Sequence, residues 1–340
     1  MIQNTNIKVS LTPELRLEQA LKEAGIKDPA TVAQLTVSGT FTNDDFKYIR
    51  EEMWETLQGL DMGNAKVKGN KIEDVAFYCE RLVFIIIPDL TTEIESFAFL
   101  GCNALTSIMI HPENPYLASH DGIMYNKDKT ELIFCPQGKQ DDCVISNSVV
   151  KIGDCAFDDC NGVDNIFIPA SVIEIGWNVF SGQYITVHPD NPAYTSDEGI
   201  LFSKDKKELI AYPRKRQGDY QIPDSVEKIG FEAFSGCSGL TSIAIPDSVT
   251  EIGAYAFFAC EGLTSVIIPD SVKVIQSMAF YGCTSLKSVF IPASAVKISL
   301  TNLFSCPANI TVHPDNPKYT SKNGKLKRKK ISHTIKNINQ

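Results

Sequence analysis

The stretch CEGLTSVIIPDSVKVIQSMAFYGC, residues Cys260–Cys283, begins and ends on cysteine, and the chain then starts nearly the same pattern again. An Ile-Pro pair and a cysteine both recur every 23 residues through this part of the chain, and a Phe keeps almost the same step. The Ile-Pro pairs begin at Ile222, Ile245, Ile268 and Ile291. A period of this length is the sequence signature of a solenoid, in which each repeat forms one coil of the stack.

The phenylalanine column extends the repeat upstream and marks eight coils. Its members are Phe77, Phe99, Phe157, Phe180, Phe234, Phe257, Phe280 and Phe304. A single coil is not stable alone, because fixing its backbone costs about 1–2 kcal/mol per residue while each buried apolar side chain returns only about 1.5–3 kcal/mol. Stacking buries the faces that each coil leaves open, so the sequence predicts coils that depend on their neighbours.

Within one coil, the residue pattern predicts two short strands and a turn. Leu263–Pro269 alternates as a strand, which Pro269 ends because proline has no N–H to donate. Ser271–Ile275 is predicted as a second strand, and Ser277–Cys283 as a helical turn that places Phe280 in the core. The predicted fold class is an α/β repeat solenoid with parallel strands and short helical turns.

The cysteines of the repeat are predicted to be buried thiols. Seven of the ten keep the repeat position: Cys79, Cys102, Cys160, Cys237, Cys260, Cys283 and Cys306. Disulfides and metal ligands are the functional alternatives for such a column. Free cysteine packs as a small buried hydrophobe, however, and no CxxC pair has the spacing of a zinc site. We therefore expect these cysteines to have a structural role.

Two of the spacings are 35 residues instead of 23, and the additional residues are themselves repeated. HPENPYLASHDGIMYNKDKTELIFCPQGKQ begins at His111, and HPDNPAYTSDEGILFSKDKKELIAYPRKRQ begins at His188. Apolar runs flank a charged turn in each, which predicts β-hairpin inserts near residues 111–140 and 188–217. They are expected to project from one edge of the solenoid or to lie against it, and to serve either partner binding or protection of a strand edge.

A third copy of the insert begins at His313 and then degenerates into the basic run KLKRKK, residues Lys325–Lys330. We interpret residues 313–340 as a degenerate copy with a solvated basic tail, because the run lies at a terminus. A nuclear signal or a contact with a polyanion is the alternative for such a run.

The repeat resembles the BspA-type leucine-rich repeats, also called the Treponema-type class. That unit is roughly Leu-x-x-Ile-x-Ile-Pro-x-Ser-Val-x-x-Ile-Gly-x-x-Ala-Phe-x-x-Cys, and GLTSIAIPDSVTEIGAYAFFAC at Gly239–Cys260 fits it almost letter for letter. The match covers residues 67–312. The resemblance implies a curved, right-handed solenoid, often found on bacterial or parasite surfaces and used for adhesion or partner binding, and it supplies no catalytic residues. The Phe180 coil departs from the pattern because it has no Cys, and the Phe77 coil is one residue short.

Residues 1–66 are predicted to form an N-terminal cap of two helices plus strands, since a bare solenoid end would expose its core. One helix is expected from Thr12 to Gly25, and a second, opened by Thr42 with Asp45, through Leu57. Thr31–Val37 alternates as a strand, and Leu57–Val67 fits a leucine-rich-repeat strand. The cap is therefore expected to join the sheet of the array.

Composition argues against nucleic acid as a partner and against a membrane span. The net charge is −9, whereas nucleic acid selects basic surfaces. The longest apolar run, Leu82–Ile87, is far shorter than the roughly 18 residues of a membrane helix. The first residues lack the basic start and apolar stretch of a secretory signal. The family resemblance implies a secreted or cell-surface protein, and the cytoplasm is the alternative.

The sequence contains no pattern that indicates an enzyme. It has no GxGxxG after a strand, no Walker motif, no HExxH and no GxSxG. His111, His188 and His313 occupy one repeated position, which favours a turn role over a triad or metal cluster. Asp190 and Asp315 offer too few oxygens for Ca²⁺, which takes about 6–8. We predict a non-catalytic protein without cofactor or metal.

The strand residue between the two inward apolar residues should face solvent. Along the array this column contains Ile86, Met109, Phe167, Thr186, Ala244, Ile267, Phe290 and Thr311. Five of the eight are large and apolar, and stacked coils would place them about 4.8 Å apart. The candidate partner-binding residues are therefore Ile86, Met109, Phe167, Ile267 and Phe290. The alternative is that they stabilise the sheet by covering one another.

These features predict a non-catalytic scaffold for protein–protein interaction or adhesion. It would bind a protein or an extracellular-matrix-like macromolecule through the sheet face and possibly the hairpins. A preformed array loses little entropy on binding. The alternative is a glycan-binding cell-surface module, for which shallow aromatic platforms with polar rims would be the structural sign.

Overall fold

The computed structural model describes residues 6–300 and 308–329. The chain divides into two compact units, unit 1 (Met1–Tyr194) and unit 2 (Thr195–Gln340). Phe304, Cys306 and Lys330, which the sequence assigns to the repeat columns and the basic run, lie outside the described residues. Each unit is a stack of parallel strands, which confirms the predicted repeat solenoid.

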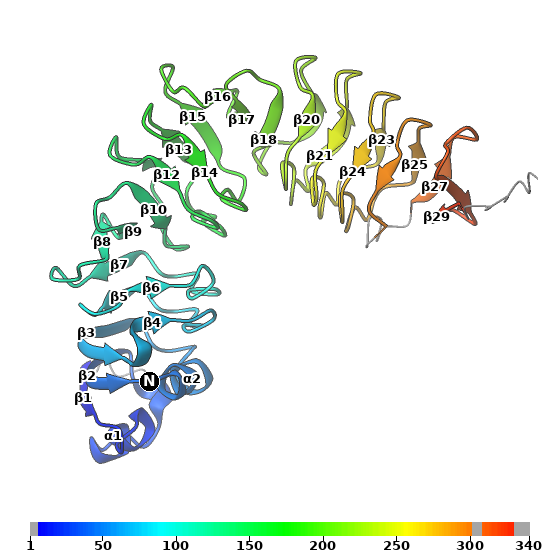
Figure 1. Ribbon diagram of the computed structural model, residues 1–340. Helices are drawn as coiled ribbons and strands as arrows, with labels where there is room; N and C mark the ends of the chain where they lie inside the picture. Colours follow the sequence, from blue (N-terminus) through cyan, green and yellow to red (C-terminus); the bar gives the residue numbers. More distant parts are fainter. Residues whose placement is uncertain (1–5, 301–307, 330–340) are drawn as a thin grey trace, which may run out of the picture. The chain divides into compact units, whose positions relative to one another are not determined.

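Unit 1 contains four sheets (Figure 1). The largest parallel sheet has the order β1 (Asn6–Leu11), β2 (Gln34–Phe41), β3 (Gly59–Val67), β5 (Phe84–Ile87), β7 (Ser107–Ile110). A second parallel sheet is formed by β11 (Cys143–Val144), β13 (Asn165–Ile168) and β15 (Tyr184–Val187). The short second strands of the coils form the pair β4 (Lys71–Ile72) and β6 (Glu93–Ile94), and the sheet of β8 (Leu117–His120), β9 (Ile123–Asn126), β10 (Glu131–Phe134), β12 (Lys151–Ile152) and β14 (Glu174–Ile175).

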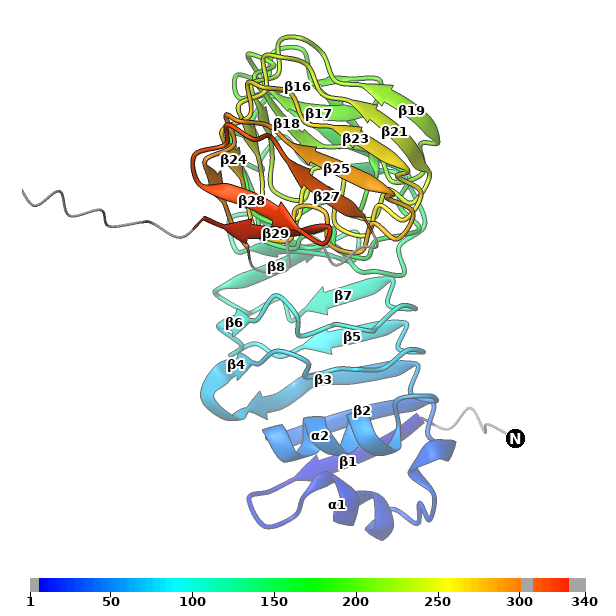
Figure 2. The same ribbon diagram turned by 90° about the vertical axis from the view of Figure 1, so that its right-hand side faces the viewer.

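In unit 2 the first strands of the coils form one sheet and the short second strands form another (Figure 2). One is the parallel sheet of β19 (Gly218–Gln221), β21 (Leu240–Ala244), β23 (Ser265–Ile267), β25 (Ser288–Ile291) and β27 (Asn309–Val312). The other has the order β16 (Tyr194–Asp197), β17 (Ile200–Ser203), β18 (Glu208–Ala211), β20 (Lys228–Ile229), β22 (Glu251–Ile252), β24 (Val274–Ile275), β26 (Lys297–Ile298). A separate pair is formed by β28 (Tyr319–Lys322) and β29 (Lys325–Arg328).

The phenylalanine column forms a stack of buried rings inside each unit. In unit 2 the ring of Phe257 lies 5.1 Å from that of Phe234 and 5.1 Å from that of Phe280, with interplanar angles of 16° and 9°. In unit 1 Phe77 and Phe99 stack at 5.2 Å. The described rings of this column, apart from that of Phe180, are at most 1% exposed, so each coil covers the aromatic surface of the next.

The cysteine column forms a second ladder beside the rings. The Cys260 thiol donates to the carbonyl of Phe234 at 3.0 Å, and the Cys283 thiol to that of Phe257 at 3.1 Å. In unit 1 the Cys102 thiol donates to the carbonyl of Phe77 at 3.1 Å. All nine cysteines that the structure describes are buried, and none of them forms a disulfide. The thiol therefore fills the small space beside the ring and satisfies a carbonyl between coils.

Burial determines how these thiols titrate. It raises the pKa of Cys102 and of Cys237 to about 12, well above the ordinary thiol value of about 8.5. We expect no reaction of these thiols with Ellman's reagent at neutral pH until urea unfolds the chain. Because the folded-state pKa is raised, their contribution to stability is complete below about pH 8.5 and is lost as the pH rises toward 12. Rapid reaction of these thiols with the reagent at neutral pH in the folded chain would contradict the expectation.

The predicted helical turn in each coil is wrong. Met278 has a φ of 53°, in the left-handed region that interrupts an α-helix. The segment instead forms turns in which the N–H of Tyr281 donates to the carbonyl of Met278. Backbone bonds to the neighbouring coil, such as that from Phe257 N–H to Ala279 C=O at 2.8 Å, replace the bonds of a helix.

The two α-helices of the described residues are α1 (Leu17–Glu23) and α2 (Asn43–Glu52), with short 3₁₀ turns at Pro29–Thr31 and Lys68–Asn70. The first begins five residues after Thr12, whose hydroxyl accepts the N–H groups of Glu14 and Leu15 and closes a turn instead. The second has the predicted capping box of Thr42 and Asp45, but it ends at Glu52, before the predicted Leu57.

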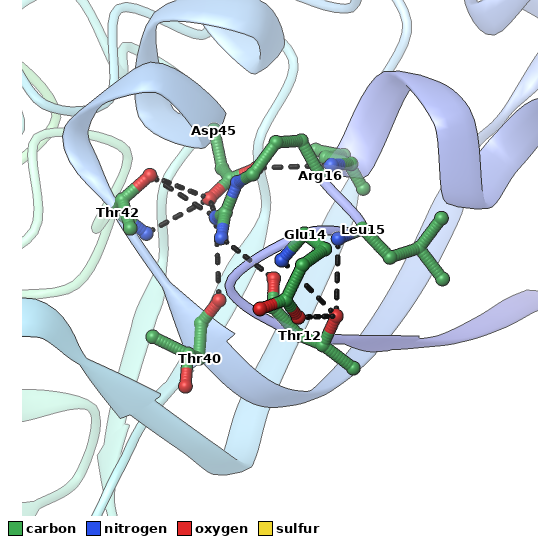
Figure 3. Close-up of polar contacts among 8 residues, drawn as sticks. Thr12, Glu14, Leu15, Arg16, Thr40, Thr42 and Asp45 are labelled. Carbon is green, nitrogen blue, oxygen red and sulfur yellow. Dashed lines mark hydrogen bonds and ion pairs between the residues drawn. The ribbon is translucent and has the colours of Figure 1, made fainter.

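Asp45 joins the starts of the two helices (Figure 3). Its carboxylate is 1% exposed and pairs with the guanidinium of Arg16. The carboxylate also accepts the N–H of Leu17 at 3.0 Å and the N–H of Thr42 at 2.8 Å. The strands β1 and β2 of this N-terminal region lie in the same sheet as β3, β5 and β7.

Each complete insert forms part of the solenoid wall. The strands β8, β9 and β10 are antiparallel to their neighbours, and β10 then pairs parallel with β12. Ile123, Met124 and Tyr125 are buried, which explains why this segment does not project. The ring of Phe134 lies 5.3 Å from that of Phe99, and the Cys135 carbonyl accepts the Cys160 thiol at 3.2 Å. The insert thus supplies a coil of its own.

The first insert also covers a strand edge. The N–H of Ile108 in β7 donates to the carbonyl of Gly122 at 2.9 Å, and that of Ile110 donates to the Ser119 hydroxyl at 3.0 Å. Gly122 has a φ of 75°, and a Cβ there would lie 2.8 Å from the Thr106 carbonyl. Only glycine therefore brings the turn close enough to occupy this edge. In unit 2 the N–H of Ile310 donates to the carbonyl of Gly324 at 3.0 Å.

The HPxNP motif contains an asparagine that clips two coils together. Asn114 is fully buried, and its amide donates to the carbonyls of Pro88 and Thr91 at 3.0 and 2.8 Å. Its side-chain carbonyl accepts the N–H groups of Tyr116 and Leu117, both at 2.8 Å. Asn191 and Asn316 make the same four kinds of bond in the other copies.

The third copy keeps two strands of the insert, so the prediction of a solvated tail is wrong for Lys325–Arg328. These residues form β29, which pairs antiparallel with β28 in a register that joins Tyr319 to Arg328. Leu326 packs against the core of unit 2, whereas Lys325 and Lys327 are exposed. The alternation of one apolar side chain with cations gives the strand a covered face and a solvated face.

Candidate interaction surface

The outward column of unit 2 exposes large apolar side chains on a rigid sheet. Ala244, Ile267, Phe290 and Thr311 lie side by side in the register of β21, β23, β25 and β27. Ile267 is 78% exposed and Phe290 is 44% exposed, whereas the residues on either side of them point inward and are buried. The structure therefore brings two of the predicted site residues together on adjacent strands.

The predicted histidines have a second contact that the sequence did not suggest. The ring of His313 lies edge-on to that of Phe290, with centroids 6.1 Å apart and an interplanar angle of 78°. Phe167 and His188 form the same pair at 6.3 Å and 82°. The Nδ1 atoms of His188 and His313 accept the N–H of Asp190 and Asp315, both at 3.1 Å, which is the turn role expected of them.

Unit 1 places its members of the column on two sheets. Ile86 and Met109 are register partners on β5 and β7, where Met109 is 38% exposed and Ile86 is half-buried. Phe167 lies on β13, half-buried, beside Thr186 of β15. The first insert separates β7 from β11, so these residues do not form one continuous ladder.

Val144 is an exposed member of the column that the sequence analysis missed. It is 74% exposed and pairs in register with Phe167. Its strand, β11, has only two residues and is not followed by the Ile-Pro pair that marks the other coils. The signal available in the sequence was the position of Val144 directly before Ile145, the residue that ends the 35-residue spacing.

Small hydroxyl side chains border the outward column of unit 2. Thr241, Ser265 and Ser288 are exposed on the same strands, and Thr264 is exposed directly before β23. The Thr264 hydroxyl donates to the carbonyl of Thr241 at 3.1 Å, so part of this border is already hydrogen-bonded. The Thr241 hydroxyl in turn donates to the exposed carboxylate of Asp219 on β19 at 2.6 Å. An apolar centre with a polar border is suited to binding a protein surface.

Neither a metal site nor a membrane-spanning helix is found among the described residues. Within residues 6–300 and 308–329, no group of three or more His, Cys, Asp or Glu side chains is placed to hold a metal ion. Among the helices in the same ranges, none combines the length and the apolar character needed to cross a bilayer.

Solved structures that are similar to this chain include several bacterial proteins. They include the pneumococcal vaccine antigen PcpA (20% identity, TM-score 0.49, covering 84% of this chain and 63% of that one). A leucine-rich cell surface protein from Faecalibacterium prausnitzii has 26% identity and a TM-score of 0.43, covering 71% of this chain and 82% of that one. A leucine-rich repeat protein from Eubacterium ventriosum has 17% identity and a TM-score of 0.42, covering 84% and 90%. The chain thus spans less than two thirds of the pneumococcal protein.

The repeat itself matches a family model. The BspA-type leucine-rich repeat region matches in six copies, over residues 70–138, 130–189 and 211–323. No curated protein matches the chain. The matched ranges cover well over half of the chain and include the stacked Phe and Cys columns described above, and no catalytic family is indicated. The chain belongs to the BspA-type leucine-rich repeat family.

Proposed function

We propose that this protein is a non-catalytic scaffold that binds a protein partner through the outward column of its sheets. The observation that carries the proposal is the pair Ile267 and Phe290, exposed by 78% and 44% on adjacent strands. Exposed apolar side chains at the centre of a polar border are the typical anchors of an interface. Their strands are fixed by inward neighbours, so binding would order little of the protein.

The same proposal extends to unit 1, where exposed Val144 and half-buried Phe167 form a second pair in register. Ile86 and Met109 form a third. We propose that the protein acts at the cell surface or in the extracellular space, as the family resemblance implies, with adhesion to an extracellular-matrix-like macromolecule as the form of binding.

The column can be tested with charge substitutions on two neighbouring strands. We expect Ile267→Asp with Phe290→Asp to weaken binding to a partner found in a panel of extracellular-matrix proteins by at least about tenfold, because a buried anchor contributes about 2 kcal/mol or more. Ser238→Asp with Thr284→Asp is the matched control, since it adds the same charge to exposed positions in the turns of unit 2, outside the outward column and its border. Surface plasmon resonance measures the affinity, and circular dichroism verifies folding. Unchanged binding by the folded first variant would rule out the column.

A glycan-binding function is a second candidate, favoured by exposed aromatic side chains in the turns of the coils. Trp177 is 48% exposed in unit 1, with its ring 6.3 Å from that of Phe97. Phe231 is 43% exposed in unit 2, with its ring 5.7 Å from that of Tyr255. Binding on a glycan array that is lost in Trp177→Ala or Phe231→Ala, and kept in Ile267→Asp, would favour this candidate over the first.

A further inference from the structure

A cavity of about 930 Å³ lies in unit 2 between β24, β26 and the β28–β29 pair. Its volume is in the range of about 300–1,000 Å³ that is typical of binding pockets. Val274 and Ile275 come from β24, Lys297 and Ile298 from β26, and Arg328 from β29. The sequence did not indicate this cavity, because the segments that enclose it come from different repeats.

The charge pattern of the second strands changes at this cavity. Upstream, Glu208, Lys228 and Glu251 alternate in register, and Lys228 pairs with Glu208 at 2.8 Å. Unit 1 has the same pairing, with Lys151 and Glu131 at 3.0 Å. Such cross-strand pairs neutralise the lysines of the sheet.

The next two positions in unit 2 break this alternation, with valine in place of a base and lysine in place of an acid. Val274 follows Glu251 in register, and Lys297 follows Val274. Lys297 therefore faces a valine, and no carboxylate of the described residues lies within ion-pair distance of it. One cation at the cavity therefore has an uncharged neighbour on the adjacent strand.

Further cations come from the third copy of the insert. Lys318, Arg328 and Lys329 also line the cavity. The Lys329 ammonium donates to the carbonyl of Asn316 at 2.6 Å, which fixes its position. Residues 316–329 contain six Lys or Arg residues and no Asp or Glu, although the chain as a whole has a net charge of −9. The local excess of positive charge attracts anions to this end of unit 2.

The uncharged walls of the cavity indicate what kind of anion fits. Val274 and Val296 are half-buried aliphatic side chains, and Gln276 and Ser299 add an amide and a hydroxyl. Tyr319 is 1% exposed, and its hydroxyl bonds the N–H and C=O of Ile298. The lining therefore provides no open aromatic face on which a nucleobase could stack.

We propose that this cavity binds an acidic peptide segment of a partner protein. The carboxylates pair with Lys297, Lys318 and Arg328, and apolar side chains of the peptide contact Val274 and Val296. The Ser299 hydroxyl and the side-chain carbonyl of Gln276, whose amide donates to Glu251, hydrogen-bond the peptide backbone. The site is independent of the outward column, and its residues are not among those proposed to bind a partner there.

The test uses the full chain and a fluorescein-labelled peptide of alternating Glu and Val, followed by fluorescence anisotropy. Val274→Glu places a carboxylate beside Lys297 in the register of β24 and β26, and we expect it to weaken binding at least about tenfold by neutralising Lys297. Lys297→Ala with Arg328→Ala should have an effect of similar size. Lys325→Ala with Lys327→Ala is the control, since it removes the same charge from exposed positions outside the cavity, and it should weaken binding less than about twofold.

Three results would overturn the proposal. One is absence of binding by the labelled peptide to the unmodified chain, and another is equal weakening by the two double variants, which would show a general charge effect. The third is tighter binding of an oligothymidylate than of a peptide of equal charge. Circular dichroism of each variant separates loss of the site from loss of folding, and Ile267→Asp should leave peptide binding unchanged, which separates this site from the outward column.

Discussion

Replacing Phe257 by alanine is expected to destabilise the chain by about 3–5 kcal/mol, the range for removal of a buried aromatic side chain. Phe257 is fully buried between the rings of Phe234 and Phe280, each 5.1 Å away. The substitution opens a cavity that two coils share and removes both stacking contacts. Urea unfolding followed by circular dichroism measures the change in the free energy of unfolding.

Phe290→Ala is the matched control for this substitution. Its ring is 44% exposed and lies on the outside of the same stack of coils. We expect it to change stability by less than about 1 kcal/mol. Similar losses in the two variants would mean that the Phe257 ring is not the contact that joins the coils.

Replacing Asn114 by alanine is expected to destabilise the chain by about 3 kcal/mol, because buried hydrogen-bonding groups left without partners cost about 1–3 kcal/mol each. The substitution removes the donors to the carbonyls of Pro88 and Thr91 and the acceptor of two backbone N–H groups. Asn191→Ala should have an effect of similar size, since it makes the equivalent bonds in the second insert.

Asn161→Ala controls for the change of residue type, because Asn161 is exposed. We expect an effect within about 0.5 kcal/mol for it. Asn114→Asp keeps the acceptor but loses the two donated bonds, so it should remain strongly destabilising. A stable Asn114→Asp variant would show that the bonds to the preceding coil contribute little.

The repeat columns could be predicted from the sequence because their spacing is itself the information. A residue that returns every 23 positions must occupy the same place in each coil, and this gave the stacked Phe257 ring, the buried Cys260 thiol and the outward Ile267. The family resemblance rested on the same positions, and the family match covers them.

The features that the sequence did not reveal depend on bonds between distant residues. The Asn-Pro context of Asn114 is typical of a turn, but the carbonyls that accept its amide belong to the preceding coil. The helix expected at Thr12 begins at Leu17 because the Thr12 hydroxyl satisfies the local N–H groups first. The turn at Met278 is not helical because bonds to the adjacent coil favour a left-handed residue there.

The candidate surface was only partly visible for the same reason. The column identified Ile267 and Phe290, which the structure places on adjacent strands. It did not show that the first insert separates the Met109 strand from that of Val144. The cavity beside Lys297 was not predicted, because it depends on the third insert copy folding into β28 and β29.

The central claim is that successive coils stack in register, one repeat apart. Methyl nuclear Overhauser effects in a deuterated, Ile/Val-methyl-labelled sample test this most directly. The account predicts strong effects from Val266 to Ile243 and from Val266 to Val289, the partners in adjacent strands, and weaker ones from Ile243 to Val289. Strong effects at any other offset, or none between these three residues, would contradict it.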